Sequence, residues 1–102
     1  MRKRSIQTSQ VLQALLDGPE GETYGFELVK VTGLPSGSVY PILRRLEEEQ
    51  LVTVREEVIN PGARRPRYRV FYRLNAEGRR VAREATREKD AALRSLNPGW
   101  HI

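Results

Sequence analysis

Small, hydroxyl-bearing and cationic residues gather over residues 36–45 of the chain, in the sequence SGSVYPILRR. Two serines, a glycine and a tyrosine come first, and a pair of arginines follows. Free backbone N–H groups at a helix start attract anions, and guanidinium groups pair bidentately with phosphate or with guanine. The chemistry that these residue types indicate, at this spacing, is the recognition of a polyanion.

A second basic segment lies downstream, where residues 64–73 carry five arginines and no acid. Strand alternation places one set of its residues on one face, namely Arg67, Arg69, Phe71 and Arg73. The opposite face is expected to belong to the core, and it carries Tyr68, Val70, Tyr72 and Leu74. Arg64 and Arg65 would then lie at a loop tip, within reach of a DNA backbone or a narrow minor groove. A charge run of this kind is also typical of a solvated face.

Catalytic chemistry is not indicated. The sequence has no paired carboxylates, phosphate loop, nucleophile and base pair or metal cluster, so we expect neither an enzyme nor a cofactor. Cysteine is absent, which excludes disulfides and is consistent with a reducing compartment. No apolar run approaches the roughly 18 residues of a membrane span. We therefore expect a cytoplasmic protein without a membrane partner.

Charge is unevenly distributed along the 102 residues, of which 38% are hydrophobic and 30% charged. Lys and Arg number 18 against 13 Asp and Glu, and residues 55–102 hold twelve of the basic and six of the acidic side chains. This imbalance favours a nucleic-acid partner over a membrane, although it also fits a function in solubility alone. The length fits one small domain.

Hydrophobic periodicity predicts three helices in the first half of the chain. The first is capped by Ser5 and runs to about Asp17, and the second spans residues 24–31 and stops at Gly33. The third, over residues 34–50, carries the clearest apolar stripe, which consists of Val39, Ile42, Leu43 and Leu46.

In the second half of the chain, the hydrophobic pattern changes from a helical period to one typical of strands. Residues 51–59 and 68–74 are rich in β-branched and aromatic residues, and the sequence NPGARRP between them is typical of a turn, which predicts a two-stranded hairpin. Asn75 can cap a last helix over residues 76–96. The fold class is therefore mainly α with a two-stranded β-hairpin, that is, a winged helix-turn-helix with an added C-terminal helix.

In the third helix, the 100° step turns Gly37, Pro41, Arg44 and Glu48 away from the core. If Ser38 is the N-cap, Pro41 breaks no intrahelical bond, and if Ser36 caps, the first turn is distorted. We expect the DNA-contacting residues to be Ser36, Gly37, Ser38, Tyr40, Pro41, Arg44, Arg45, Arg64, Arg65 and Arg67. The alternative is that Tyr40 and Pro41 pack on the second helix while Arg44 and Arg45 pair with residues 47–49.

Small apolar side chains and abundant charges in the last helix predict a dimerisation helix, although the helix could also pack on its own domain. The expected dimer contacts are Val81, Ala85, Ala92, Leu93, Leu96 and Trp100. A two-fold dimer would match a palindromic site. The expected division of the chain is a DNA-binding domain over 1–74, a dimerisation helix over 75–97 and a tail over 98–102.

The sequence YGFELVKVTGLPSGSVYPILRRLEEEQLV, followed by a basic hairpin and YRLNAEGRRVA, resembles the PadR family of bacterial transcriptional regulators over about residues 10–85. The resemblance implies a homodimer that usually acts as a repressor and releases DNA when a small-molecule effector binds. It assigns DNA contacts to the start of the third helix and to the arginines of the hairpin, which is the wing of this fold. With one short C-terminal helix, the chain matches the small subgroup of that family.

Two function classes follow. The first is a sequence-specific regulator of double-stranded DNA. The second is a winged-helix module for protein or RNA contacts, which would be insensitive to the loss of Arg64 and Arg65 and to added salt.

Overall fold

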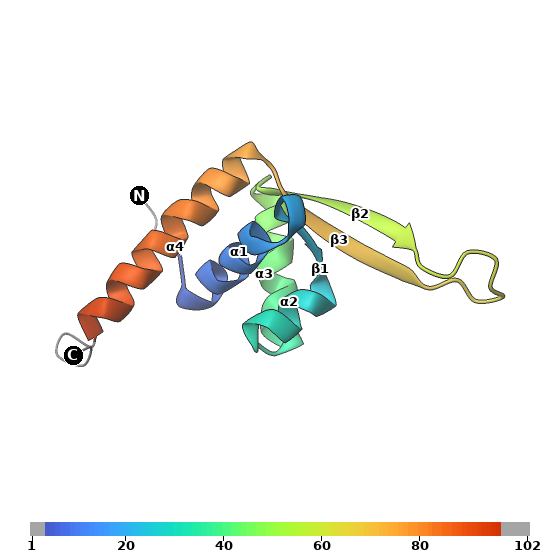
Figure 1. The fold of residues 1–102 in the computed structure, drawn as a ribbon, viewed down its shortest axis with the longest axis horizontal. Coiled ribbons are helices and arrows are strands. Elements are labelled where there is room, and N and C mark those ends of the chain that lie inside the picture. Colours follow the sequence, from blue (N-terminus) through green and yellow to red (C-terminus); the bar gives the residue numbers. More distant parts are fainter. Residues whose placement is uncertain (1–3, 97–102) are drawn as a thin grey trace.

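The fold is a small helical body with a hairpin on one side and a long helix on the other (Figure 1). The computed structural model describes residues 4–96. The elements follow in the order α1 (Ile6–Asp17), the 3-10 turn η1 (Pro19–Gly21), β1 (Glu22–Tyr24), α2 (Gly25–Thr32), α3 (Ser36–Glu48), β2 (Val52–Val58), β3 (Tyr68–Leu74) and α4 (Ala76–Leu96). The hairpin and α4 extend in opposite directions and give the molecule dimensions of 58 × 27 × 23 Å.

The first two helices begin and end where local chemistry requires it. The Ser5 hydroxyl accepts a hydrogen bond from the Thr8 N–H at 3.1 Å, and α1 stops before the Gly18-Pro19 pair. Helix α2 ends at Gly33, which has a φ of 71° and donates its N–H to the Val29 carbonyl. The positions predicted for both helices are confirmed.

Helix α3 buries the predicted stripe, but its start differs from both predicted caps. The N-cap is Pro35, so Ser36 is the first helical residue and Pro41 the sixth. A residue at that depth would normally donate to the carbonyl four residues earlier, here that of Gly37. The alternative in which Ser38 caps the helix and Pro41 breaks no intrahelical bond is therefore not observed, and the Gly37 carbonyl lacks its helical donor.

The sheet has three antiparallel strands in the order β1-β3-β2, so the predicted two-stranded hairpin was incomplete. Strand β1 has only three residues, too few for alternation to be recognised, and the helical spacing of Tyr24 with Leu28 had suggested helix instead. The hairpin itself is confirmed, with Val58 opposite Tyr68 at its far end and Val52 opposite Leu74 at its base.

The inner face of the sheet is buried only at its base. Leu74 is buried and Tyr72 packs partly against the core, whereas Tyr68 is 58% exposed. The expectation that Tyr68 belongs to the core was wrong, because the hairpin extends past the helical body that would have covered this side chain (Figure 1).

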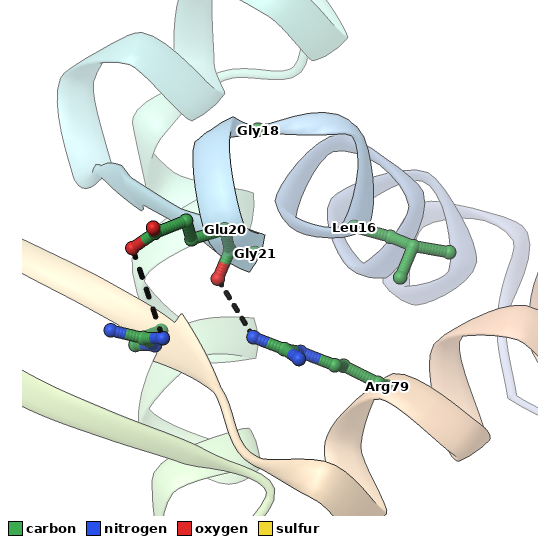
Figure 2. A pocket seen from close by; sticks show the side chains of 6 residues that line it. Leu16, Gly18, Glu20, Gly21 and Arg79 are labelled. Carbon is green, nitrogen blue, oxygen red and sulfur yellow. Dashed lines mark hydrogen bonds and ion pairs between the residues drawn. The ribbon is translucent and has the colours of Figure 1, made fainter.

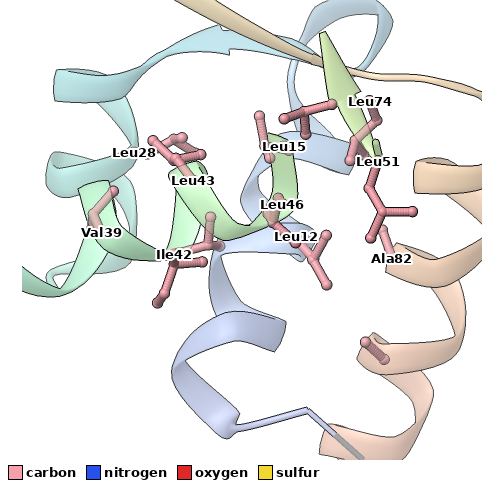
Figure 3. Close-up of a cluster of buried hydrophobic side chains, with 13 residues drawn as sticks. Leu12, Leu15, Leu28, Val39, Ile42, Leu43, Leu46, Leu51, Leu74 and Ala82 are labelled. Carbon is pink, nitrogen blue, oxygen red and sulfur yellow. The ribbon is translucent and has the colours of Figure 1, made fainter. Parts of the chain in front are cut away.

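One hydrophobic core joins all the helices to the base of the sheet (Figure 3). Each fully buried leucine contributes roughly 1.5–3 kcal/mol. The buried apolar residues are Val11, Leu12, Leu15, Leu28, Val39, Ile42, Leu43, Leu46, Leu51, Val52, Leu74, Ala82 and Ala85.

The first turn of α4 is bonded to the rest of the domain, whereas its C-terminal end is exposed. The Asn75 amide oxygen accepts the Gly78 N–H at 2.7 Å, and its amide nitrogen donates to the Gln50 carbonyl at 2.6 Å. A Cβ on Gly78 would lie 2.1 Å from the Leu51 carbonyl oxygen, so the helix start presses directly on the chain before β2. The middle of α4 packs on α1, whereas its last six residues, 91–96, are exposed.

Candidate nucleic-acid interface

The outward face of α3 is open and carries two unpaired arginines. Residues 36, 37, 40, 41, 44 and 45 are exposed and Ser38 is half-buried. A Cβ added at Gly37 would meet nothing within 4 Å. Within residues 4–96, neither Arg44 nor Arg45 has an ion-pair partner, while Glu49 pairs with Arg4 at 3.0 Å. The alternative in which both arginines pair with residues 47–49 is therefore not observed.

Tyr40 packs against α2, as one of the two alternatives predicted, and is also partly exposed. Its ring packs against Gly25 at the start of α2, yet 40% of the residue remains exposed. Tyr40 is also close enough to Tyr72 of β3 to influence the pKa of its hydroxyl. Burial raises the pKa of the Tyr72 hydroxyl, Tyr40 and Glu47 raise it further, and the Arg44 guanidinium partly opposes them. The start of α2 at Gly25, the Tyr40 side chain of α3 and Tyr72 of β3 therefore lie near one another beside the outward face of α3.

The loop between β2 and β3 is organised by Asn60, a residue that the sequence analysis did not single out. Its carbonyl accepts the Ala63 N–H at 3.2 Å around Pro61 and Gly62, and Gly62 has a φ of 86°, as in a type II turn. The Asn60 side chain donates to the Arg65 carbonyl at 3.2 Å and accepts the Arg67 N–H. An asparagine before Pro-Gly is a known turn signal that could have revealed this role.

Three arginines with free charges follow this turn, and the backbones of Arg65 and Arg67 are held by hydrogen bonds. Arg64, Arg65 and Arg67 are all exposed, and none has an ion pair within the described part of the chain. Unpaired guanidinium groups on an ordered loop suit contact with phosphates, because no internal partner has to be displaced.

The arginines within the hairpin strands, in contrast, have partners in their own chain. Arg55 donates to both carboxylate oxygens of Glu22 at 2.8 and 3.0 Å, and these bonds hold the pKa of Glu22 below its usual value. The Arg55 guanidinium also stacks 4.3 Å from the ring centre of Phe71, and Arg69 stacks in the same way on Tyr24. The two rings meet edge to face at 5.9 Å. This network ties β1 to both hairpin strands.

Two further arginines line a hollow of about 480 Å³ beside the η1 turn (Figure 2). Arg79 donates to the Glu20 carbonyl at 3.0 Å, and Arg73 pairs with the Glu20 carboxylate at 3.9 Å. Both arginines thus have protein partners, unlike those of α3 and the wing tip. Figure 2 shows Arg79 reaching from α4 to the turn that follows α1.

The expected dimer residues divide between the core and the surface. Ala85 is buried in the core of its own chain and Val81 packs partly against it, so Ala85 is not available to a second chain. Ala92, Leu93 and Leu96 are exposed on the free end of α4, and Leu96 is 69% exposed. Trp100 lies outside the described residues.

Other kinds of site are not indicated in the described residues. Within residues 4–96, no three acidic or histidine side chains are grouped so that they could hold a metal ion. None of the helices in this range is both long and apolar enough to cross a membrane.

The model of the transcriptional regulator PadR-like family matches residues 11–84, from α1 through the middle of α4. The chain belongs to this family. No curated protein is significantly similar to this PadR-like chain. The family match confirms the resemblance that the sequence indicated, and the chain is a winged-helix transcriptional regulator.

Solved structures place the PadR-like chain among winged-helix regulators. BpsR of Bordetella bronchiseptica, whose DNA binding is regulated by 6-hydroxynicotinic acid, has a TM-score of 0.73 and 25% identity over 97% of this chain and 69% of its own. A MarR-family regulator of Streptomyces coelicolor in complex with DNA has a TM-score of 0.69 and 23% identity over 94% and 56%. The circadian clock associated protein Pex from Anabaena has a TM-score of 0.67 and 22% identity over 90% and 81%.

Proposed function

We propose that this PadR-like chain is a sequence-specific regulator of double-stranded DNA that acts as a homodimer on a palindromic operator. The observation that carries the proposal is the set of exposed arginines without ion pairs on α3 and at the wing tip. Arg44 and Arg45 on α3 and the three arginines at the wing tip have no ion pairs within residues 4–96, whereas Arg55 and Arg73 of the hairpin strands do. The exposed residues Arg83, Arg87 and Arg94 of α4 are likewise without ion pairs in this range, so the proposal depends on where the free arginines lie and not on their being free. A polyanion is the partner that free arginines on a helix-turn-helix and its wing suit.

The two elements have different roles in this proposal. The start of α3 enters the major groove, where Arg44 reads a base edge and Ser36, Gly37, Ser38, Tyr40 and Pro41 approach the backbone. The wing arginines, which are 64, 65 and 67, contact phosphates or the adjacent minor groove. Their side chains can reach past the body because the hairpin extends beyond it (Figure 1).

Dimerisation is assigned to the free end of α4. Leu93 and Leu96 are exposed there, and Ile6 at the start of α1 is 47% exposed. A hollow of about 370 Å³ lies between these two ends and is lined by Arg4, Ile6, Ser9, Glu88, Lys89, Ala91, Ala92 and Ser95. Apolar surface of this kind supports pairing with the same region of a second chain.

The sign of regulation and its control complete the proposal. Repression follows from occupancy of an operator that overlaps a promoter, and a small-molecule effector would release the DNA. The regulation of BpsR by 6-hydroxynicotinic acid supports such an effector, because that protein shares the winged-helix fold at 25% identity.

The test is the selection of bound duplexes from a random pool, with the mass of the free protein measured in solution. We expect a palindromic consensus with half-sites about one helical turn, roughly 34 Å, apart, and a dimeric mass. Binding should also weaken steeply as salt is added. Enrichment of no sequence above the random pool would contradict the proposal.

A further inference from the structure

Gly25, the first residue of α2, lies directly under the ring of Tyr40. Gly25 is buried, and a Cβ placed on it would lie 2.7 Å from Tyr40 Cε1, 3.0 Å from its hydroxyl oxygen and 3.1 Å from Cζ. The three nearest atoms all belong to the phenol. The ring therefore occupies the space that a side chain at position 25 would need.

We propose that Gly25 is a positioning residue for DNA recognition, because its missing side chain forms the seat that directs the phenol of Tyr40 toward the duplex. This inference rests on the proposed function. Tyr40 leaves α3 beside Pro41 on the exposed face, and the seat holds its ring while 40% of the residue remains accessible to a ligand. A phenol held in one direction loses less conformational entropy when it binds a phosphate.

Gly25 and Gly78 differ in the kind of atom that an added methyl group would meet. A methyl at Gly78 would strike the Leu51 carbonyl, which is backbone and cannot move without the strand. A methyl at Gly25 would strike the outer end of a half-exposed side chain, which can rotate into solvent. Gly25 also has no positive φ, so alanine fits its backbone conformation. Substitution should therefore displace Tyr40 rather than unfold the domain.

The main experiment is a double-mutant cycle on the duplex selected above, with Gly25→Ala, Tyr40→Ala and the double variant. We expect Gly25→Ala to weaken binding by about tenfold, the scale of one hydrogen bond to a charged group, while Tm falls by less than about 4 °C. In the Tyr40→Ala background, Gly25→Ala should weaken binding no further, because no ring remains to be displaced. The control is Val31→Ala, a 63% exposed position on the same helix, which should bind like the wild type.

Two results of the cycle would overturn the inference while the proposed function stands. One is wild-type affinity in Gly25→Ala. The other is an equal loss from Gly25→Ala with and without Tyr40, which would give the glycine a structural role independent of the phenol. Failure of the wild type to bind any selected duplex refutes the proposed function first, and the inference with it.

A measurement without DNA tests the seat itself. The Hα protons of Gly25 lie against the Tyr40 ring, so its ring current should shift their NMR resonances. We expect Tyr40→Ala to return these resonances to ordinary glycine values, and Tyr40→Phe to leave them shifted. Gly25 resonances that do not respond to Tyr40→Ala would overturn the inference whatever the DNA result.

Discussion

Arg44 and Arg65 are chemically identical and equally free of partners, but they are carried by elements with different roles. We predict that Arg44→Ala costs about 1–3 kcal/mol of binding free energy and relaxes the preference at one base pair. Arg65→Ala should weaken selected and scrambled duplexes alike, because phosphates carry no sequence information. The test is to measure the dissociation constants of both variants for the selected and the scrambled duplex at one salt concentration. Equal losses on both duplexes for both variants would contradict this division of roles.

Two helical glycines should respond to alanine in opposite directions. Gly78→Ala places a methyl 2.1 Å from the Leu51 carbonyl oxygen and should lower the free energy of unfolding by about 3 kcal/mol. Gly37→Ala meets nothing within 4 Å and should raise it by about 0.5–1 kcal/mol, because alanine favours the helix. Urea unfolding of both variants measures the difference. A similar loss for both would contradict the close contact at Gly78.

At the residue scale, the sequence predicted which side chains of α3 face outward, because the 100° step fixes them once the buried stripe is known. It could not separate Gly25 and Gly78 from Gly37. The atoms that approach the first two glycines come from Tyr40 and Leu51, which are distant in the chain. Their roles became visible only when the packing was known.

Among the elements, α3 carries a proline where a stable helix would not. Replacing Pro41 with alanine restores the hydrogen bond to the Gly37 carbonyl, so we predict an increase of about 1–3 kcal/mol in the free energy of unfolding. The same change removes a ring from the exposed face, so DNA affinity should fall. Thermal unfolding and a binding titration on one preparation test both expectations. Greater stability with unchanged affinity would exclude Pro41 from the contact surface.

Periodicity located the long elements well and the short ones poorly. The apolar stripes of α1 and α3 and the cap at Asn75 gave helices close to the observed ones. Strand β1 was missed because three residues show no period, and it is held in the sheet by the Glu22–Arg55 bonds across β3. Alternation gave the faces of β3 correctly, but it could not show that Tyr68 lies beyond the helical body.

For the molecule as a whole, we predict that charge at the free end of α4 prevents dimerisation. The double substitution Leu93→Asp and Leu96→Asp changes exposed residues and should leave the helical content of the protein unchanged. Sedimentation equilibrium should then give a monomer, and the affinity for a palindromic site should fall because the two half-sites are no longer linked. The matched control is Arg83→Gln on an exposed position of α4, where a dimer should persist. A dimeric double variant would contradict the assignment.

The connection between β3 and α4 is too short to act as a hinge. One residue, Asn75, separates β3 from α4, and its side chain bonds to Gly78 in the first turn of α4 and to Gln50 in the segment before β2. A helix of 21 residues rises about 31 Å from this fixed origin. In a dimer built on α4, this rigid connection would fix the distance between the two DNA-binding domains. Tolerance for operators of other spacing would then have to come from twisting and bending of the duplex rather than from the protein.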